Sequence, residues 1–182
     1  MPVDLALRDE LLAMADADRR LRRSLPAVII HDPAAAYPAA RRDLDAIHGA
    51  RLWEILDDLE CWPGRVLVGD DGAEAAWSLA QHAVFDPELQ RRCLEMLETA
   101  VDCDDARAIH YALLLDRVRM AQGRDQVYGS QLVRSDGDAE VLVPWPIEDA
   151  TAVDARRATV GLGPLGDYVR VMRDRYAGLV RR

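Results

Sequence analysis

The sequence predicts a mainly α-helical protein, a single-domain helical bundle over residues 1–182 with one small β-hairpin near residues 131–143. Three observations lead to this prediction. Apolar residues recur at the three- and four-residue spacing of amphipathic helices over most of the chain. Two short β-prone runs flank a turn-rich SDGD segment, which is typical of a hairpin. The length suits one domain with its own core, and no repeat or linker divides the chain.

Three helices are predicted before the middle of the chain. Asp4 can cap the first, which ends before the loop SLPAVIIHDPAAAYP because the prolines of that loop break a helix. The second runs from about residue 39 to residue 60 and ends before WPG, and its leucines and isoleucines fall on one side. The third contains the stretch AEAAWSLAQHAV. All three present an apolar stripe that a bundle core would cover.

Two further helices follow in the central part of the sequence. Asp86 is typical of an N-cap, and Pro87 then occupies the first helical position of a fourth helix. Asp104 or Asp105 is expected to cap a fifth helix, which ends near Gly123. The apolar residues of the fourth helix form an uninterrupted stripe, so we expect this helix to pack closely on the core.

The last part of the chain contains the hairpin and two helices. Thr151 is expected to cap a short helix that contains DARR, and Gly161 to end it. A final helix follows Pro164. The stretch GLGPLG between these helices formally matches a dinucleotide-binding motif, but it follows a helix and not a strand, so we interpret it as a helix connection.

Composition excludes several classes of function. The net charge of -9 argues against nucleic acid or an anionic membrane as a partner. Because there is no lysine, no Schiff-base nucleophile, pyridoxal-phosphate anchor or P-loop lysine is available. The 3 cysteines lack paired spacing, and the chain has neither a signal-peptide pattern nor an apolar run of membrane-spanning length. A cytoplasmic, soluble protein is predicted, and a homodimer is left open.

Five polar residues interrupt the apolar helix faces. Asp18, Asp45, His48 and Asp116 occupy inward positions, and His82 lies at the edge of its helix's apolar face. Buried carboxylates need partners, so these residues could form one polar cluster in the helical core. Helix faces are broad, however, and the same residues could reach water at the edge of each face. Asp45 and His48 could be a base with its orienting acid, or a surface ion pair.

Metal binding is the weaker hypothesis for these residues. Asp45-x-x-His48 has an acid-x-x-His spacing that some helical bundles use for metals. The spacing occurs once, with Asp in place of Glu, and the chain lacks an HExxH motif. We therefore predict neither a metal site nor an organic cofactor.

Four stretches carry a specific resemblance: CWPGRVLVGDDGAEAAWSLAQHA, LLLDRV, QVYGSQ and PIEDATAVDARRATVGLGPLGDY. They are similar to motifs of an uncharacterised bacterial family, the domain of unknown function DUF6624, and the likeness covers most of the chain from Asp45 onward. The pattern of that family includes Trp62, Pro63, Trp77, Gln81, His82, Asp116, Arg117, Gln126, Tyr128, Gly129, Gln131, Arg156 and Arg157 as they stand here. The family more often has Asn in place of His48, which weakens a metal site or a base there. The resemblance implies no activity.

The coincidence of a histidine, inward aspartates and several amides predicts a cofactor-free enzyme. It would act on a small molecule by hydrolysis, elimination or cyclisation, in a pocket between helices. The expected catalytic residues are His82, Asp116 and Tyr128. The expected substrate-binding residues are Trp77, Gln81, Arg117, Gln126, Gln131 and Arg156. The amides would orient the substrate, and an arginine would hold a carboxylate or a developing negative charge.

Two alternatives remain open at this point. In the first, the chain is a non-catalytic binding or partner-interaction module, and the same polar residues brace the QVYGSQ segment and the hairpin against the helices. In the second and weaker one, the chain is a metal-dependent hydrolase. Both depend on which side chains meet in space.

Overall fold

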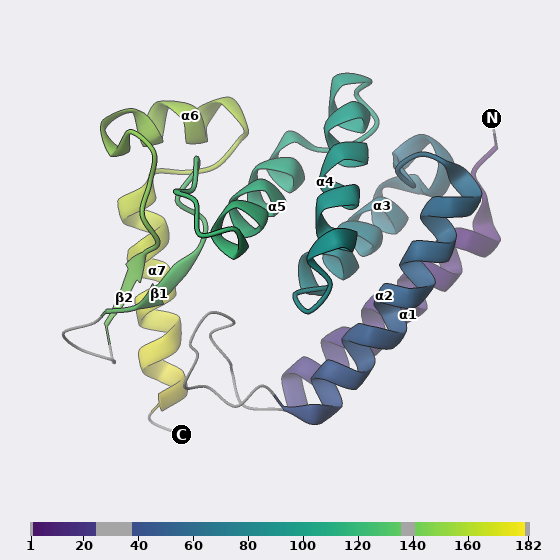
Figure 1. Cartoon of the computed structure of the whole chain (residues 1–182), viewed down its shortest axis with the longest axis horizontal. Helices are drawn as coiled ribbons and strands as arrows, with labels where there is room; N and C mark the ends of the chain where they lie inside the picture. Colours follow the sequence, from purple (N-terminus) through teal and green to yellow (C-terminus); the bar gives the residue numbers. More distant parts are fainter. Residues whose placement is uncertain (1, 25–37, 136–140, 181–182) are drawn as a thin grey trace. The chain divides into compact units, whose positions relative to one another are not determined.

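The structure is a computed structural model that describes residues 2–24, 38–135 and 141–180. These residues contain seven α-helices, one short 3-10 helix and a two-stranded sheet (Figure 1). The prediction of a mainly α protein with a small hairpin is confirmed. No helix in the described part of the chain is both long enough and apolar enough to cross a membrane.

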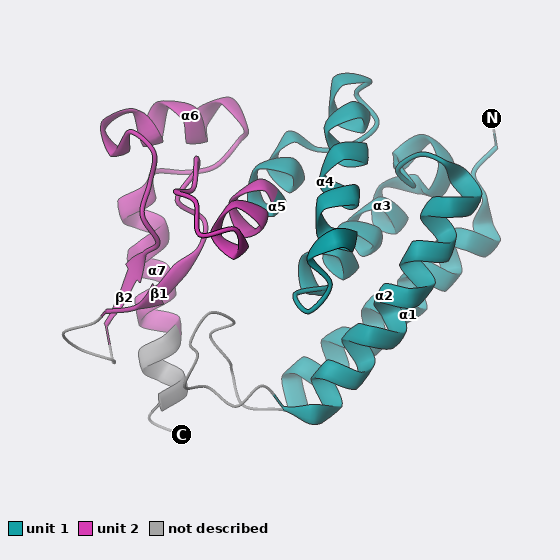
Figure 2. Cartoon of the chain, viewed as in Figure 1, with its two compact units in different colours: residues 1–26, 37–114 teal, residues 27–36, 115–182 magenta. Residues whose placement is uncertain are grey.

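The chain divides into two compact units (Figure 2). Unit 1 comprises the described residues up to 114, and unit 2 comprises those from 115 onward. The division falls inside helix α5 (Ala108–Ala121), so one continuous helix contributes to both units. The expectation of a single domain stays a prediction.

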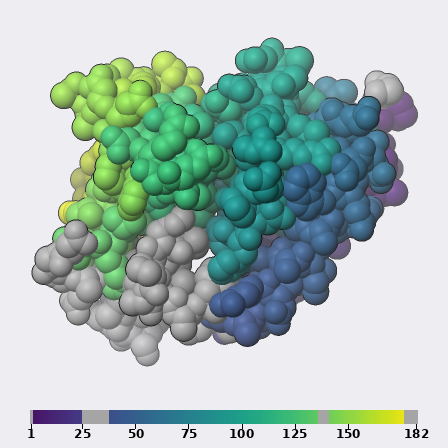
Figure 3. Space-filling view, viewed as in Figure 1, coloured from purple at the N-terminus to yellow at the C-terminus, as the bar shows by residue number. Residues whose placement is uncertain are grey.

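Unit 1 is a helical bundle. It contains α1 (Leu5–Ser24), α2 (Ala39–Leu59), α3 (Arg65–His82), α4 (Pro87–Asp102) and the first part of α5. Helix α3 packs against α1, α2 and α4. The fully buried apolar side chains include Leu11, Leu52, Leu56, Val68, Leu89, Leu97 and Leu114. In the space-filling view, α2 in blue and α4 in teal form much of the visible face of this unit (Figure 3).

Two predicted helix caps of unit 1 are confirmed. Asp4 Oδ1 accepts a hydrogen bond from the N–H of Leu7 at 3.0 Å. Asp86 Oδ1 accepts one from the N–H of Leu89 at 2.9 Å, with proline at the first position of α4. Helix α3 begins earlier than the motif that predicted it and contains a kink at Gly69, whose φ is 74°. Glycine adopts this left-handed conformation without the steric cost of a side chain.

The predicted cap of α5 is wrong. Asp105 Oδ1 accepts the N–H of Val66 at 2.7 Å, in the first turn of α3, while α5 begins only at Ala108. The loop that carries Asp105 lies so close to α3 that a Cβ on Gly64 would come within 2.1 Å of the Asp105 carboxylate. Tertiary contact therefore decides which helix this aspartate caps, and local sequence does not contain that information.

Unit 2 is built around the hairpin and the last helix. Strands β1 (Leu132–Arg134) and β2 (Leu142–Pro144) are antiparallel, with Leu132 opposite Pro144. Helix α7 (Leu165–Val180) covers them, and the buried cluster consists of Leu132, Leu142 and Val169 with Leu165, Tyr168 and Met172 packed against it. The turn between the strands lies largely outside the described residues.

The segment between the hairpin and α7 differs from the prediction at one helix cap. A 3-10 helix η1 (Ala150–Ala152) leads into α6 (Val153–Thr159). Thr151 Oγ1 donates to Asp149 Oδ1 at 2.6 Å and does not cap α6, so that prediction is wrong because an upstream carboxylate takes the hydroxyl. Gly161 has a φ of 79° and follows the end of α6, as predicted. GLGPLG connects α6 with α7, which agrees with its interpretation as a helix connection.

Candidate functional site

A chain of ion pairs lies at one end of α1 in unit 1. Arg22 Nε donates to Asp18 Oδ1 at 2.7 Å, and Arg22 Nη2 donates to Asp45 Oδ1 at 2.6 Å. The other oxygen of Asp18, Oδ2, lies 2.8 Å from Nδ1 of His82. Helices α1, α2 and α3 each contribute to this group, which we call the Asp18 cluster: Asp18, Arg22, Asp45, His48 and His82. The predicted meeting of inward polar residues is found for Asp18, Asp45, His48 and His82, but not for Asp116, which belongs to unit 2.

The acid and the imidazole of this cluster differ strongly in exposure. The side chain of Asp18 is 2% exposed, whereas that of His82 is 27% exposed. His82 is the last residue of α3, and it is half-buried between the buried residues Gln81 and Ala83. A buried carboxylate therefore holds one nitrogen of a ring that reaches solvent. An ion pair at this distance favours the form of the ring that carries a proton on Nδ1.

The electrostatics of the Asp18 cluster keep its acid ionised. Burial raises the pKa of the Asp18 carboxyl, but the hydrogen bond and charge of His82 and the charge of Arg22 outweigh burial, so the pKa lies below its usual value. Burial lowers the pKa of His48, although the carboxylates of Asp18 and Asp45 oppose this shift. At neutral pH, Asp18 is therefore a carboxylate and His48 a neutral imidazole.

The pairing differs from the one considered from the sequence. Asp45 and His48 were candidates for a base with its orienting acid, whereas Asp18 and His82 are the pair in hydrogen-bond distance. Sequence reasoning also missed Arg22, which bridges the two aspartates. Arg22 follows Asp18 by one helical turn, and this spacing was the available signal.

A cavity of about 320 Å³ adjoins the Asp18 cluster in unit 1. Asp45 lines it, together with Ala83, which directly follows His82. Its aromatic lining residues are Trp53 of α2 and Phe85 of the α3–α4 connection. The cavity therefore gives a small molecule access to the acidic end of the cluster.

Trp77 and Gln81 of α3 are two of the expected substrate-binding residues. The ring of Trp77 stacks on His110 with a centroid distance of 4.3 Å, and its Nε1 donates to the carbonyl of His110 at 3.0 Å. Nε2 of His110 lies 2.9 Å from Glu74. Gln81 is buried, and its carbonyl accepts from Gln90 at 3.3 Å. Neither residue lines the cavity next to Asp45.

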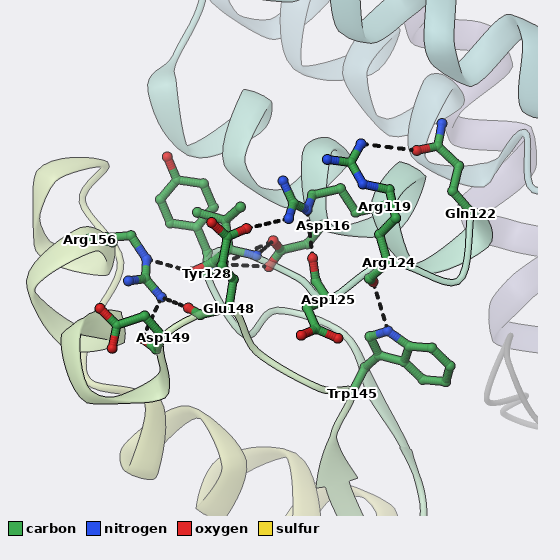
Figure 4. A network of polar contacts seen from close by, with 11 residues as sticks. Asp116, Arg119, Gln122, Arg124, Asp125, Tyr128, Trp145, Glu148, Asp149 and Arg156 are labelled. Carbon is green, nitrogen blue, oxygen red and sulfur yellow. Dashed lines mark hydrogen bonds and ion pairs between the residues drawn. The ribbon is translucent and has the colours of Figure 1, made fainter.

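Asp116 organises a loop of unit 2 (Figure 4). It is fully buried on α5. Its Oδ1 accepts the N–H of Val127 at 2.7 Å and that of Tyr128 at 3.0 Å, and its Oδ2 accepts that of Ser130 at 2.9 Å. One carboxylate thus binds three main-chain donors of the segment 127–130, which we call the Tyr128 loop. The contacts observed for Asp116 are those of a loop anchor.

The predicted glutamines and Arg156 also bind main chain around the Tyr128 loop. Gln126 Nε2 donates to the carbonyls of Gln131 at 3.1 Å and Trp145 at 2.7 Å, and its Oε1 accepts the N–H of Gln131 at 2.8 Å. Gln131 Nε2 donates to the hydroxyl of Ser130 at 2.9 Å. Arg156 donates to the carbonyl of Val127 at 2.9 Å. These groups join the loop to the hairpin and to α6.

Tyr128 and Arg157 also belong to this region. Burial and the nearby Asp116 raise the pKa of the Tyr128 hydroxyl, so it is a neutral phenol at pH 7. The sequence-based site omitted Arg157, whose Nη1 donates to the carbonyl of Tyr128 at 2.7 Å. Arg117 is half-buried on α5. The expected catalytic set is thus divided, with His82 in unit 1 and Asp116 and Tyr128 in unit 2.

The positions of the acidic and imidazole side chains also bear on metal binding. Among the described residues, no three His, Cys, Asp or Glu side chains form a group that could hold a metal ion. The Asp18 cluster contains two imidazoles and two carboxylates, but Arg22 occupies the position between the carboxylates.

The model of a family of unknown function (DUF6624) matches residues 5–181. No curated protein and no solved structure matches the chain.

Proposed function

The chain belongs to a family of unknown function, DUF6624, and from its own residues we propose that it is a cofactor-free enzyme acting on a small molecule. His82 is the general base or acid of this proposal, and Asp18 is its positioning residue. The reaction is a hydrolysis, an elimination or a cyclisation, because each of these needs proton transfer and no cofactor.

The distance of 2.8 Å between His82 Nδ1 and the buried Asp18 Oδ2 carries the proposal. With the proton held on Nδ1, Nε2 has the lone pair that removes a proton from a substrate or water. When His82 becomes an imidazolium, the adjacent carboxylate stabilises its positive charge. Arg22 holds the second oxygen of Asp18, so the carboxylate cannot turn away from the ring.

The second acid–imidazole pair of unit 1 shows why His82 is the better candidate. In the pair of Glu74 and His110, the exposures are reversed, because the imidazole is 6% exposed and the acid is 49% exposed. Trp77 covers the ring of His110 by stacking on it. A buried imidazole cannot meet a substrate, whereas His82 is accessible and lies next to a cavity-lining residue.

The test is a comparison of variants on a panel of small esters, lactones, amides and β-substituted carbonyl compounds. We expect the His82→Gln variant to lose about 10²- to 10⁴-fold in kcat/KM on any compound that the wild type converts, which is the usual contribution of a general acid or base. The Asp18→Asn variant should lose activity with a changed pH–rate profile, because the amide no longer fixes the tautomer of His82.

The matched control is His110→Gln, which removes an imidazole of the same unit that also pairs with an acid. This variant should retain the wild-type rate. Equal loss in both variants would indicate that each merely destabilises unit 1. A His82→Gln variant with full activity, or a wild type that converts no compound of the panel, would contradict the proposal.

A binding or partner-interaction module is the second candidate, and one observation favours it. Asp116, Gln126 and Arg156 all bind main-chain groups around the Tyr128 loop, as a scaffold for a presented loop would. In that case His82→Gln changes no reaction, and function depends on residues of unit 2. The Asp116 variants described in the Discussion separate stability of this loop from activity.

A further inference from the structure

The cavity next to the Asp18 cluster has a shape that a narrow molecule fits. Its floor on α2 consists of the small residues Ala46, Gly49 and Ala50. A Cβ at position 49 would lie in van der Waals contact with Leu89, 3.4 Å from its Cδ2. A volume of about 320 Å³ lies at the small end of the range for ligand pockets.

One aromatic wall of the cavity is held in place before any ligand arrives. Trp53 Nε1 donates to Asp86 Oδ2 at 2.8 Å. The other oxygen of Asp86 caps α4 through the N–H of Leu89, so the carboxylate is fixed in turn. Phe85, in the same connection, is 53% exposed, and the guanidinium carbon of Arg42 lies 5.3 Å from the centroid of its ring. The cavity thus offers one fixed ring and one accessible ring.

The charged side chains that line the cavity are carboxylates. Asp45 is 6% exposed and lies in the α2 wall, and Asp86 lies in the α3–α4 connection. The two aromatic rings also attract cations, because the guanidinium carbon of Arg42 lies 5.3 Å from the centroid of Phe85 and that of Arg92 lies 5.0 Å from the Trp53 ring. Aromatic faces together with carboxylates favour a positive ligand over a neutral or negative one.

We propose that this cavity binds a small organic cation, a primary amine in its protonated form. The ammonium group lies at Asp45, and the apolar part lies between Trp53 and Phe85. As the substrate class of the enzyme this rests on the proposed function, because Arg22 joins Asp45 to Asp18, the partner of His82. As a binding site it rests on the cavity alone.

The probe is benzylammonium, compared with benzyl alcohol, which has a similar size and no charge. Binding to the full chain is measured by ¹⁵N NMR from the indole N–H signal of Trp53. We expect saturable shifts of that signal with benzylammonium and at least about tenfold weaker binding of the alcohol, because a partly buried carboxylate and two rings discriminate by charge. Equal affinity of the two compounds would overturn the proposal.

Two variants locate the site. Ala50→Leu fills the cavity from an exposed position of α2 and should abolish binding, whereas Ala40→Leu, also exposed on α2 but outside the lining, should leave it unchanged. Asp45→Asn should weaken benzylammonium binding about tenfold and leave that of the alcohol unchanged. If Asp45→Asn does not fold, the two alanine variants still decide, and unchanged binding in Ala50→Leu overturns the proposal.

The outcome separates this inference from the proposed function. If the chain binds the amine but converts no panel compound, the amine site is supported and the proposed enzyme is contradicted. If conversion depends on His82 but shows no preference for amines, the proposed enzyme is supported and the amine site is contradicted.

Discussion

Replacement of Asp116 by alanine should destabilise unit 2 through the loss of one carboxylate. In the structure, this side chain is fully buried and accepts hydrogen bonds from three main-chain N–H groups, at 2.7 Å from Val127, 3.0 Å from Tyr128 and 2.9 Å from Ser130. Removal of the carboxylate leaves these three donors without the acceptor that they now share. Figure 4 shows how the loop folds around that single group.

The magnitude follows from the number of donors. A hydrogen bond to a charged group contributes about 1.5–3 kcal/mol, so three such bonds give at least about 4.5 kcal/mol. Water that enters the vacated space recovers part of this loss, and we expect Asp116→Ala to cost about 3–5 kcal/mol. Asp116→Asn should cost about 2–3 kcal/mol, because its NH₂ group faces a main-chain N–H on one side.

The assay is urea unfolding followed by tryptophan fluorescence, combined with amide hydrogen exchange of the Tyr128 loop. The matched control is Asp125→Ala, since Asp125 is exposed beside the same loop, and Arg119 binds its main-chain carbonyl at 2.6 Å instead of its carboxylate. This control should change stability by less than about 0.5 kcal/mol. An Asp116→Asn variant with wild-type stability and exchange would refute the role as a loop anchor and would favour the catalytic role expected from the sequence.

Two further changes test other parts of the structure. Burial lowers the pKa of His48, so the unfolded chain binds a proton at a higher pH than the folded one, and stability present above about pH 6.5 is lost as the pH falls. His48→Asn should reduce this loss, by up to about 1.4 kcal/mol per pH unit, in urea titrations between pH 7 and 5; an unchanged slope would contradict it. Gly129→Ala should cost about 1 kcal/mol more than Gly123→Ala in thermal unfolding. Both glycines have a positive φ, but only a Cβ at position 129 would contact Leu165, at 2.8 Å. Equal costs would show that Leu165 moves aside without a penalty.

Much of the fold could be predicted because helix periodicity and capping are local properties. Asp4 and Asp86 cap their helices through bonds to residues three positions later, and both caps were predicted correctly. Asp105 and Thr151 have the same residue chemistry, yet the first caps a helix distant in sequence and the second binds Asp149. When the N–H group that an aspartate caps is distant in sequence, the two residues have no characteristic spacing, so the cap cannot be predicted from the sequence.

The sequence identified most residues of the Asp18 cluster, but not which of them pair with each other. Interrupted apolar faces identified Asp18, Asp45, His48 and His82, and the structure places all four in unit 1. The same argument also identified Asp116, which serves a different loop. Periodicity gives the direction of a side chain from its own helix axis, but partners depend on the rotation and offset of neighbouring helices, which helix periodicity does not determine.

Arg22 explains how two buried carboxylates can stand near an imidazole without losing their charge. Its Nε and Nη2 belong to one rigid plane, and they reach Asp18 at 2.7 Å and Asp45 at 2.6 Å. A lysine offers a single point charge on a flexible stem and could not hold both carboxylates in a fixed relative orientation. Because one oxygen of Asp18 is held in this way, its other oxygen meets His82 in one direction only. The same guanidinium that stabilises the buried acids therefore also sets the direction in which His82 can exchange a proton.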